Sequence, residues 1–144
     1  LPLRADLSGD PTYRELLAAT RETLLDALDH QDITFGRMVT ALNTPLDLGR
    51  AQIFQVLFVF DEFDGDGGVP LPGLRIEEFP LAIPKTLHDV MLYARPIPDG
   101  LHTRFVYDSG LFTEATMASI AQRYEDLLRA AVDHPDHPLS SLGR

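Results

Sequence analysis

The stretch "IFQVLFVF" (residues 53–60) decides the fold class of this chain. It is nearly all apolar, rich in β-branched and aromatic side chains, and too short for an ordinary surface helix. Such a run is typical of a strand that is covered on both faces. We therefore expect a buried strand here, in a protein that also contains helices.

Two helices are expected before this strand. Apolar residues recur at helical spacing from about Pro11 to Asp29, and the pair Asp10–Pro11 is a helix-start signal, an N-cap followed by proline. A shorter helix is expected from about Thr34 to Leu42, stopped by residues 43–45. The chain thus reaches the strand through a helix–corner–helix segment.

The chain after this strand alternates between strand and helix patterns. Residues 74–81 suggest a short edge strand, and residues 87–97 and 101–108 a hairpin closed by the turn "PDG". A final helix is expected from an N-cap at Thr113 to about Asp133, with one apolar stripe. The Pro- and Ser-containing residues 134–144 are interpreted as a linker that leaves a domain formed by residues 1–133. The fold class predicted is mixed α/β, with helices packed on a mixed β-sheet.

Composition excludes several classes of function. The 144 residues fit one domain, and the net charge of −10 argues against nucleic-acid binding and against docking on anionic lipid. The chain has no cysteine, which excludes disulfides, thiolate metal sites and a cysteine nucleophile, and favours a cytoplasmic location. No apolar run approaches the roughly 18 residues that suggest a membrane span. Because the first residue is Leu1 and not Met, we expect a piece of a longer protein.

The corner "DALDHQDITFGRM" (residues 26–38) invites a catalytic interpretation. His30 and Asp32 could be an acid–base or metal-ligand pair, but residues two apart on a helix point to different sides. At a helix end, a histidine can bond to the last carbonyls and an aspartate can cap the next helix. The residue types favour this structural interpretation, and the catalytic one stays open at this point.

No metal site is predicted. The acidic loop "DEFDGDGGVPLPG" (residues 61–73) resembles a calcium loop at its start, but Gly73 stands where the bidentate Glu is needed. His88 and Asp89 are neighbours on an expected strand and so face opposite sides, and His134 and His137 lie in the tail. No GxSxG, Walker A or GxGxxG stretch is present either. The residues alone give a soluble α/β domain without a convincing catalytic set.

Three segments in order resemble the C-terminal part of a nonribosomal peptide synthetase condensation domain. Arg4 matches the arginine that ends the family's segment beginning "FVNT", "HQDITFG" matches the "HQD-x-PFE" segment, and "RAQIFQ" matches the end of "R-D-x-S-R-x-P-L-F-Q". Thr34 and Gly36 depart from the second pattern, and Ala51 and Ile53 from the third. "PKTLHDVML" is longer than the family's usual strand entry. The matching residues, which the resemblance implies are structural or tunnel-lining, are Arg4, His30, Gln31, Asp32, Phe35, Arg50, Phe54 and Gln55.

The resemblance implies one lobe of a chloramphenicol-acetyltransferase-like domain that joins aminoacyl or peptidyl thioesters through amide bonds. It implies no cofactor bound directly, because the substrates ride on phosphopantetheine arms of carrier proteins. The implied partners are the N-terminal lobe of the same domain, upstream and downstream carrier proteins and an adjacent adenylation domain. The family's catalytic "HHxxxDG" has no match here, so no catalytic residue is expected in this chain, which alone is expected to be inactive and able to self-associate.

Two alternatives remain at this stage. Epimerisation, cyclisation and ester-forming domains share the fold, and a non-catalytic domain that recruits carriers or partner proteins could have kept it. In either case the resemblance makes "HQD" a structural corner between two helices, in agreement with the interpretation from the residues.

Overall fold

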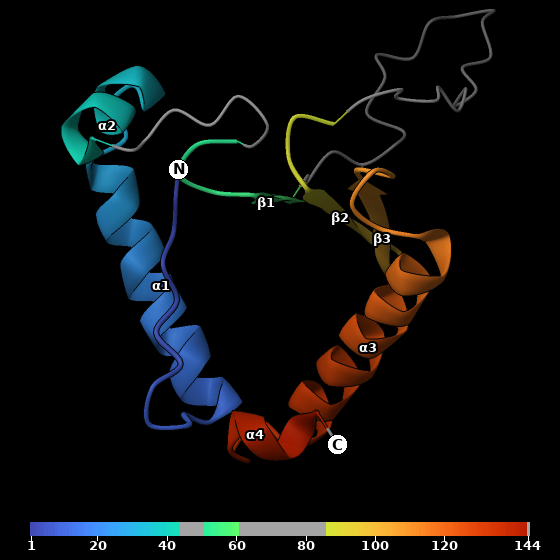
Figure 1. Ribbon diagram of the computed structural model, residues 1–144. Coiled ribbons are helices and arrows are strands. Elements are labelled where there is room, and N and C mark those ends of the chain that lie inside the picture. The colour runs from blue at the N-terminus through green and yellow to red at the C-terminus, as the bar shows by residue number, and fades with distance from the viewer. Residues whose placement is uncertain (44–50, 61–85, 144) are drawn as a thin grey trace, which may run out of the picture. The chain divides into compact units, whose positions relative to one another are not determined.

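The computed structural model describes residues 1–43, 51–60 and 86–143 (Figure 1). The chain divides into two compact units, and each is described by itself: Leu1–Leu46 with Glu114–Arg144, and Asp47–Thr113. The expected acidic loop 61–73 and edge strand 74–81 lie outside the described residues.

The second unit contains a three-stranded sheet in the order β1-β2-β3, formed by Val56–Phe60, Val90–Ile97 and Gly100–Tyr107. β1 runs parallel to β2, with Val56 opposite Val90, and β2 and β3 pair antiparallel as a hairpin. The predicted hairpin and its turn are confirmed, and Gly100 holds a φ of 151° that other residues rarely adopt. The mixed sheet together with the helices confirms the predicted mixed α/β class.

The prediction that residues 53–60 form a strand covered on both faces is wrong in two respects. The strand begins only at Val56, because a tight turn at residues 52–54 precedes it. Alternate side chains of a strand point to opposite faces, and Leu57 and Val59 are half-buried while Val56, Phe58 and Phe60 are exposed. Within the described residues, one apolar face of β1 therefore lacks a covering layer. His88 and Asp89 also lie before β2 and not in it, so their expected strand geometry is wrong too.

The first helix of the first unit begins at a different residue from the one expected. α1 is Tyr13–Asp29, and its N-cap is Thr12, not Asp10. The Thr12 hydroxyl accepts from the backbone N–H of Glu15 at 3.2 Å, and the Glu15 carboxylate accepts from the backbone N–H of Thr12 at 2.8 Å. This reciprocal capping box satisfies two helix-end donors, which leaves Asp10 free to bond elsewhere.

The two other long helical segments agree with the sequence patterns. α2 is Phe35–Leu42, and Asn43 ends it in the left-handed conformation, as the stop signal at residues 43–45 predicts. α3 is Glu114–Asp133, so it starts directly after Thr113. Met117 and Ala131 of its apolar stripe are buried, whereas Ile120 and Leu127 are exposed.

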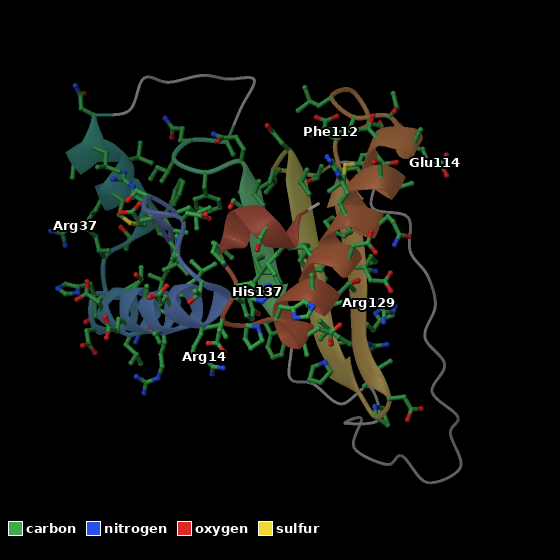
Figure 2. The ribbon with its side chains drawn as sticks, turned by 90° about the horizontal axis from the view of Figure 1, so that it is seen from below. Arg14, Arg37, Phe112, Glu114, Arg129 and His137 are labelled. Carbon is green, nitrogen blue, oxygen red and sulfur yellow. The ribbon has the colours of Figure 1, made fainter. Side chains whose placement is uncertain are left out.

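The residues after α3 are fastened to the start of α1. The backbone N–H of Arg14 donates to the carbonyl of Pro135 at 3.0 Å, and that of Leu139 donates to the carbonyl of Pro11 at 3.0 Å. The Arg14 guanidinium forms two hydrogen bonds to the Asp136 carboxylate, at 2.7 and 3.2 Å. We call residues 10–14 and 135–140 together the clasp; Figure 2 labels Arg14 beside the segment that carries His137.

Asp10 completes the clasp. Its carboxylate accepts from the backbone N–H of Ser140 at 2.9 Å and from the Ser140 hydroxyl at 2.7 Å. The chain then forms the short helix α4 (Leu139–Leu142), in which Leu142 is buried. Residues 134–143 are therefore folded against the start of α1, and the interpretation of 134–144 as a linker toward a further domain stays a prediction.

Candidate functional site

The "HQD" residues form the corner between α1 and α2. His30 is the C-cap of α1, and its backbone N–H donates to the carbonyl of Ala27 at 3.2 Å. Its ring Nδ1 lies 2.8 Å from the carbonyl oxygen of Asp26, which can only accept, so Nδ1 carries the proton. The backbone N–H of Gln31 donates to the carbonyl of Leu28 at 3.2 Å. These bonds satisfy the last carbonyls of the helix, as the structural interpretation predicts.

The charge state of His30 follows from the same geometry. The backbone carbonyl of Asp26 and, second, the Asp26 carboxylate raise the pKa of the His30 imidazole. The Asp26 Oδ1 atom lies 3.9 Å from Nδ1. A protonated imidazole at a helix C-terminus is also favoured by the helix dipole. These contacts therefore favour the charged form of His30, which ends α1 with its side chain exposed to solvent.

Asp32 does not cap the next helix, although the sequence allowed it. Thr34 is the N-cap of α2, and its hydroxyl accepts from the backbone N–H of Arg37 at 3.4 Å. Phe35, a further motif residue, is the first residue of α2. Thr34 replaces the proline of the family pattern, and a threonine supplies a capping oxygen that proline lacks.

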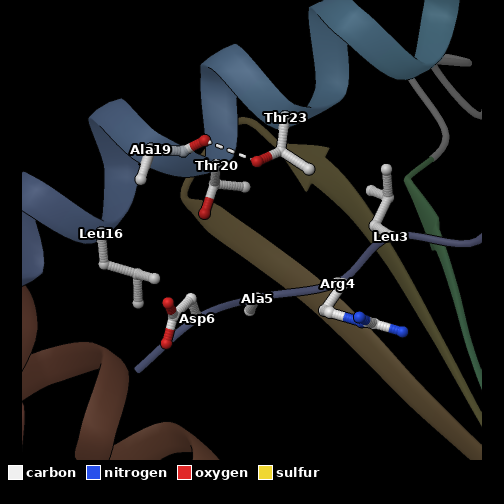
Figure 3. A pocket seen from close by; sticks show the side chains of 8 residues that line it. All are labelled: Leu3, Arg4, Ala5, Asp6, Leu16, Ala19, Thr20 and Thr23. Carbon is white, nitrogen blue, oxygen red and sulfur yellow. Dashed lines mark hydrogen bonds between the residues drawn. The ribbon is translucent and has the colours of Figure 1, made fainter. Parts of the chain in front are cut away.

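Arg4 lies in a different part of the same unit. It lines a pocket of about 130 Å³ between the extended N-terminal segment and one face of α1 (Figure 3). Leu3, Ala5 and Leu16 supply apolar surface, and the Thr23 hydroxyl donates to the carbonyl of Ala19 at 2.9 Å. The pocket is small and mostly apolar, and Figure 3 shows the Arg4 guanidinium directed away from α1.

Phe54 and Gln55 precede β1 in the second unit. The side-chain amide of Gln55 donates to the carbonyl of Ala51 at 3.0 Å. The Phe54 ring stacks on the ring of His88, with centroids 5.0 Å apart and planes 18° apart. Because β1 and β2 are parallel, the residues before both strands meet at one end of the sheet.

The structure thus groups the predicted residues into three local sets, and it does not join them into one site. The corner residues and Arg4 belong to the first unit, Phe54 and Gln55 to the second, and Arg50 lies outside the described residues. Sequence reasoning missed His88, for which the only signal was its place just before a strand. It also missed the clasp, whose Asp10–Ser140 partners are 130 residues apart.

Within residues 1–43, 51–60 and 86–143, no group of three or more His, Asp or Glu side chains is arranged to hold a metal ion. None of the helices in this described part of the chain has the length and hydropathy needed to cross a bilayer.

Comparison with known families identifies the chain. The model of the Condensation domain matches residues 1–143, nearly the whole sequence. The chain belongs to the condensation domain family.

Similar proteins are large peptide synthases. One of the linear gramicidin synthase subunits of Brevibacillus parabrevis is 38% identical over 144 residues, which cover 99% of this chain and 3% of that protein. The dimodular nonribosomal peptide synthase of Bacillus subtilis (strain 168) is 32% identical over 148 residues, 99% of this chain and 6% of that protein. This condensation-family chain therefore spans only a few per cent of the length of these relatives.

Solved structures with the same fold include the X-domain from teicoplanin biosynthesis. Its crystal structure matches with a TM-score of 0.84 at 28% identity, covering 96% of this chain and 32% of that one. A complex of the X-domain with OxyB matches with the same TM-score at 29% identity, covering 97% of this chain and 31% of that one. The likeness confirms the fold as that of a condensation-like domain, of which this chain spans about a third.

Proposed function

We propose that this chain is the C-terminal lobe of a condensation domain that forms amide bonds in nonribosomal peptide synthesis. The observation that carries the proposal is the continuous match of residues 1–143 to the family, together with 38% identity to a protein of linear gramicidin synthesis. The order of the three motif segments supports a peptide-condensing type over the other reactions that share the fold.

The proposed reaction balances without a resident cofactor. The amine of an acceptor aminoacyl thioester attacks the carbonyl of a donor thioester, the C–N bond forms, and the C–S bond breaks to release the donor thiol. The two thioesters are carried on phosphopantetheine arms of upstream and downstream carrier proteins. The N-terminal lobe supplies the "HHxxxDG" residues, so this lobe contributes binding surface and alignment, next to an adenylation domain in a cytoplasmic synthetase.

We assign the motif residues supporting roles in this reaction. The "HQD" corner is proposed to fix the junction of α1 and α2 through the hydrogen bonds that end α1, including that of the His30 ring to the carbonyl of Asp26. From the family resemblance alone, a structural or tunnel-lining role is proposed for each of Arg4, Arg50, Phe54 and Gln55. The linker to the next domain is proposed to follow residue 133, with its first residues held by the clasp.

A second candidate is a non-catalytic docking domain with the same fold. It is favoured by one observation, the similarity to the X-domain whose structure was solved in complex with OxyB. Identity to the X-domain is 28–29%, below the 38% to the gramicidin synthase relative, so we place it second.

The test uses the longer protein that contains this segment. It is mixed with donor and acceptor carrier proteins loaded with aminoacyl thioesters, and dipeptidyl thioester is measured by mass spectrometry. We expect product, and we expect its loss when the paired histidines of an upstream "HHxxxDG" are replaced, since acid–base positioning contributes about 10²–10⁴-fold. Absence of product from the unaltered protein, or absence of that motif, would favour the docking domain.

A further inference from the structure

A backbone outlier precedes β1. Ile53 holds a φ of 71°, in the left-handed region. Among the described residues, the other non-glycine positions there are Asp10 and Asn43, at 53° and 47°. Asp and Asn tolerate this region because their short polar side chains bond locally, but a β-branched residue does not. Ile53 is therefore the strained position.

The hydrogen bonds around Ile53 describe a tight turn. The backbone N–H of Phe54 donates to the carbonyl of Gln52 at 2.8 Å, which closes a three-residue turn with Ile53 at its centre. With a positive φ at the central residue, this is the rare and strained form of the γ-turn. The Gln55 side chain bridges the same turn by donating to the carbonyl of Ala51 at 3.0 Å.

The turn is also tied to the neighbouring strand. The carbonyl of Gln55 accepts from the backbone N–H of Val90 at 3.3 Å, at the first residue of β2. Just before β2, the Thr86 hydroxyl donates to the carbonyl of His88 at 2.7 Å and accepts from its N–H at 3.1 Å. These two bonds fix the backbone of His88, whose ring stacks on Phe54.

His88 carries a second unfavourable feature. Its Nδ1 atom is buried, and no partner for it is present among the described residues. A buried polar atom without a hydrogen bond is costly and uncommon in folded proteins. A phenylalanine would stack on Phe54 equally well without this cost. Two locally unfavourable residues therefore adjoin Phe54: Ile53 precedes it in the chain, and the ring of His88 stacks on it.

We propose that Ile53 and His88 are positioning residues, which fix the direction of Phe54 and Gln55 in the condensation reaction. Strained conformations persist only where the surroundings determine them, and they cluster at working sites. Here the surroundings are the bonds to Gln52, Ala51 and Val90 and the ring of His88. The inference rests on the proposed function, and neither residue is assigned contact with substrate.

The first test compares Ile53→Gly with Ile53→Ala in the longer condensation protein. Both variants lose the Ile side chain, but only glycine adopts a positive φ without strain. We expect Ile53→Gly, which keeps the turn without strain, to have the higher Tm. We expect Ile53→Ala to have a kcat about tenfold or more below that of Ile53→Gly, because alanine favours leaving the positive φ and a misplacement of about 1 Å can cost about 10²-fold. The KM for loaded carrier should change less than about twofold, since positioning acts after binding.

Each other outcome overturns the proposal. If Ile53→Ala is at least as stable as Ile53→Gly, the turn is not strained. If the two variants have equal kcat, the strain does not serve the reaction. If only KM differs, the turn contributes to binding and not to positioning.

The second test separates the ring of His88 from its nitrogens. His88→Phe keeps the stack on Phe54 and should keep kcat within about threefold, while His88→Ala should lose about tenfold or more. His102→Ala, an exposed histidine on β3, is the matched control. Equal kcat in His88→Ala and His102→Ala would overturn the role of His88, as would failure of His88→Phe to restore the rate. An inactive unaltered protein would instead contradict the proposed function itself.

Discussion

Leu142 offers the sharpest test of whether the residues after α3 belong to the folded domain. It is 7% exposed, in a four-residue helix that follows the clasp. A flexible linker would not bury a leucine, because burial of the side chain requires the backbone to be ordered as well. We expect Leu142→Ala to destabilise the protein markedly.

The magnitude follows from the burial of the side chain. Leu→Ala substitutions in cores cost about 2–5 kcal/mol, the sum of lost transfer free energy and the cavity left behind. Leu142 lies near the chain end, where the structure can relax into the space, so we expect the lower part of the range, about 2–3 kcal/mol. For a domain of this size each kcal/mol lowers Tm by about 2–4 °C, which predicts a fall of about 4–12 °C.

The control is Val132→Ala on α3. Val132 is apolar like Leu142 but 74% exposed, so its truncation should change stability by less than about 0.5 kcal/mol. Thermal and urea unfolding of the two variants, followed by circular dichroism, give the comparison. Equal Tm values for Leu142→Ala and Val132→Ala would refute the reasoning and would favour a loose linker from residue 134.

Three further predictions follow from local geometry. Thr12→Ala should cost about 1 kcal/mol of unfolding free energy because it removes the capping box of α1, whereas Thr20→Ala in the middle of α1 should cost nothing measurable by the same urea titration. The hydrogen bonds from Arg14 lower the pKa of the Asp136 carboxyl, so its contribution to stability is present above its unfolded pKa and is lost as the pH falls through the folded pKa. The Tm of Asp136→Asn should therefore fall less steeply below about pH 4 than the Tm of the unaltered protein. Parallel Tm–pH profiles of the two proteins would count against the clasp. The exposed apolar face of β1 should make the chain of residues 1–144 self-associate at micromolar concentration. Phe58→Ser should reduce the sedimentation coefficient toward that of a monomer, and an unaltered chain that is already monomeric would contradict this expectation.

The fold was predictable wherever a local pattern determines the structure. α1, α2, α3 and the hairpin of β2 and β3 were predicted within a few residues, because apolar periodicity and turn residues act over short distances, whereas α4 was not predicted. The N-cap of α1 was missed, although the pattern Thr12-x-x-Glu15 is a capping-box signature that could have identified it. The exposed face of β1 was not predictable, since a run of apolar residues does not reveal which layer covers it.

The candidate site was predictable in its parts and not in its assembly. The helix-ending role of His30 is confirmed because it depends on residues within one turn. The φ of Ile53 and the stacking of His88 on Phe54 depend on contacts between segments 34 residues apart or on strain, which no residue pattern encodes. The clasp joins the two ends of the first unit through Asp10 and Ser140, so it too lies beyond any local signal.

The ring of His30 bonds to the carbonyl of Asp26, within its own helix end, so the His–Asp pair that the sequence suggested is a helix terminus in the structure. At His30, the carbonyl of Asp26 accepts the Nδ1 proton, and together with the Asp26 carboxylate it raises the pKa of the ring. The folded state therefore gains stability from the imidazolium below the unfolded pKa and loses it as the pH rises through the folded pKa. The arrangement favours the charged form at the negative end of α1, which stabilises the helix end.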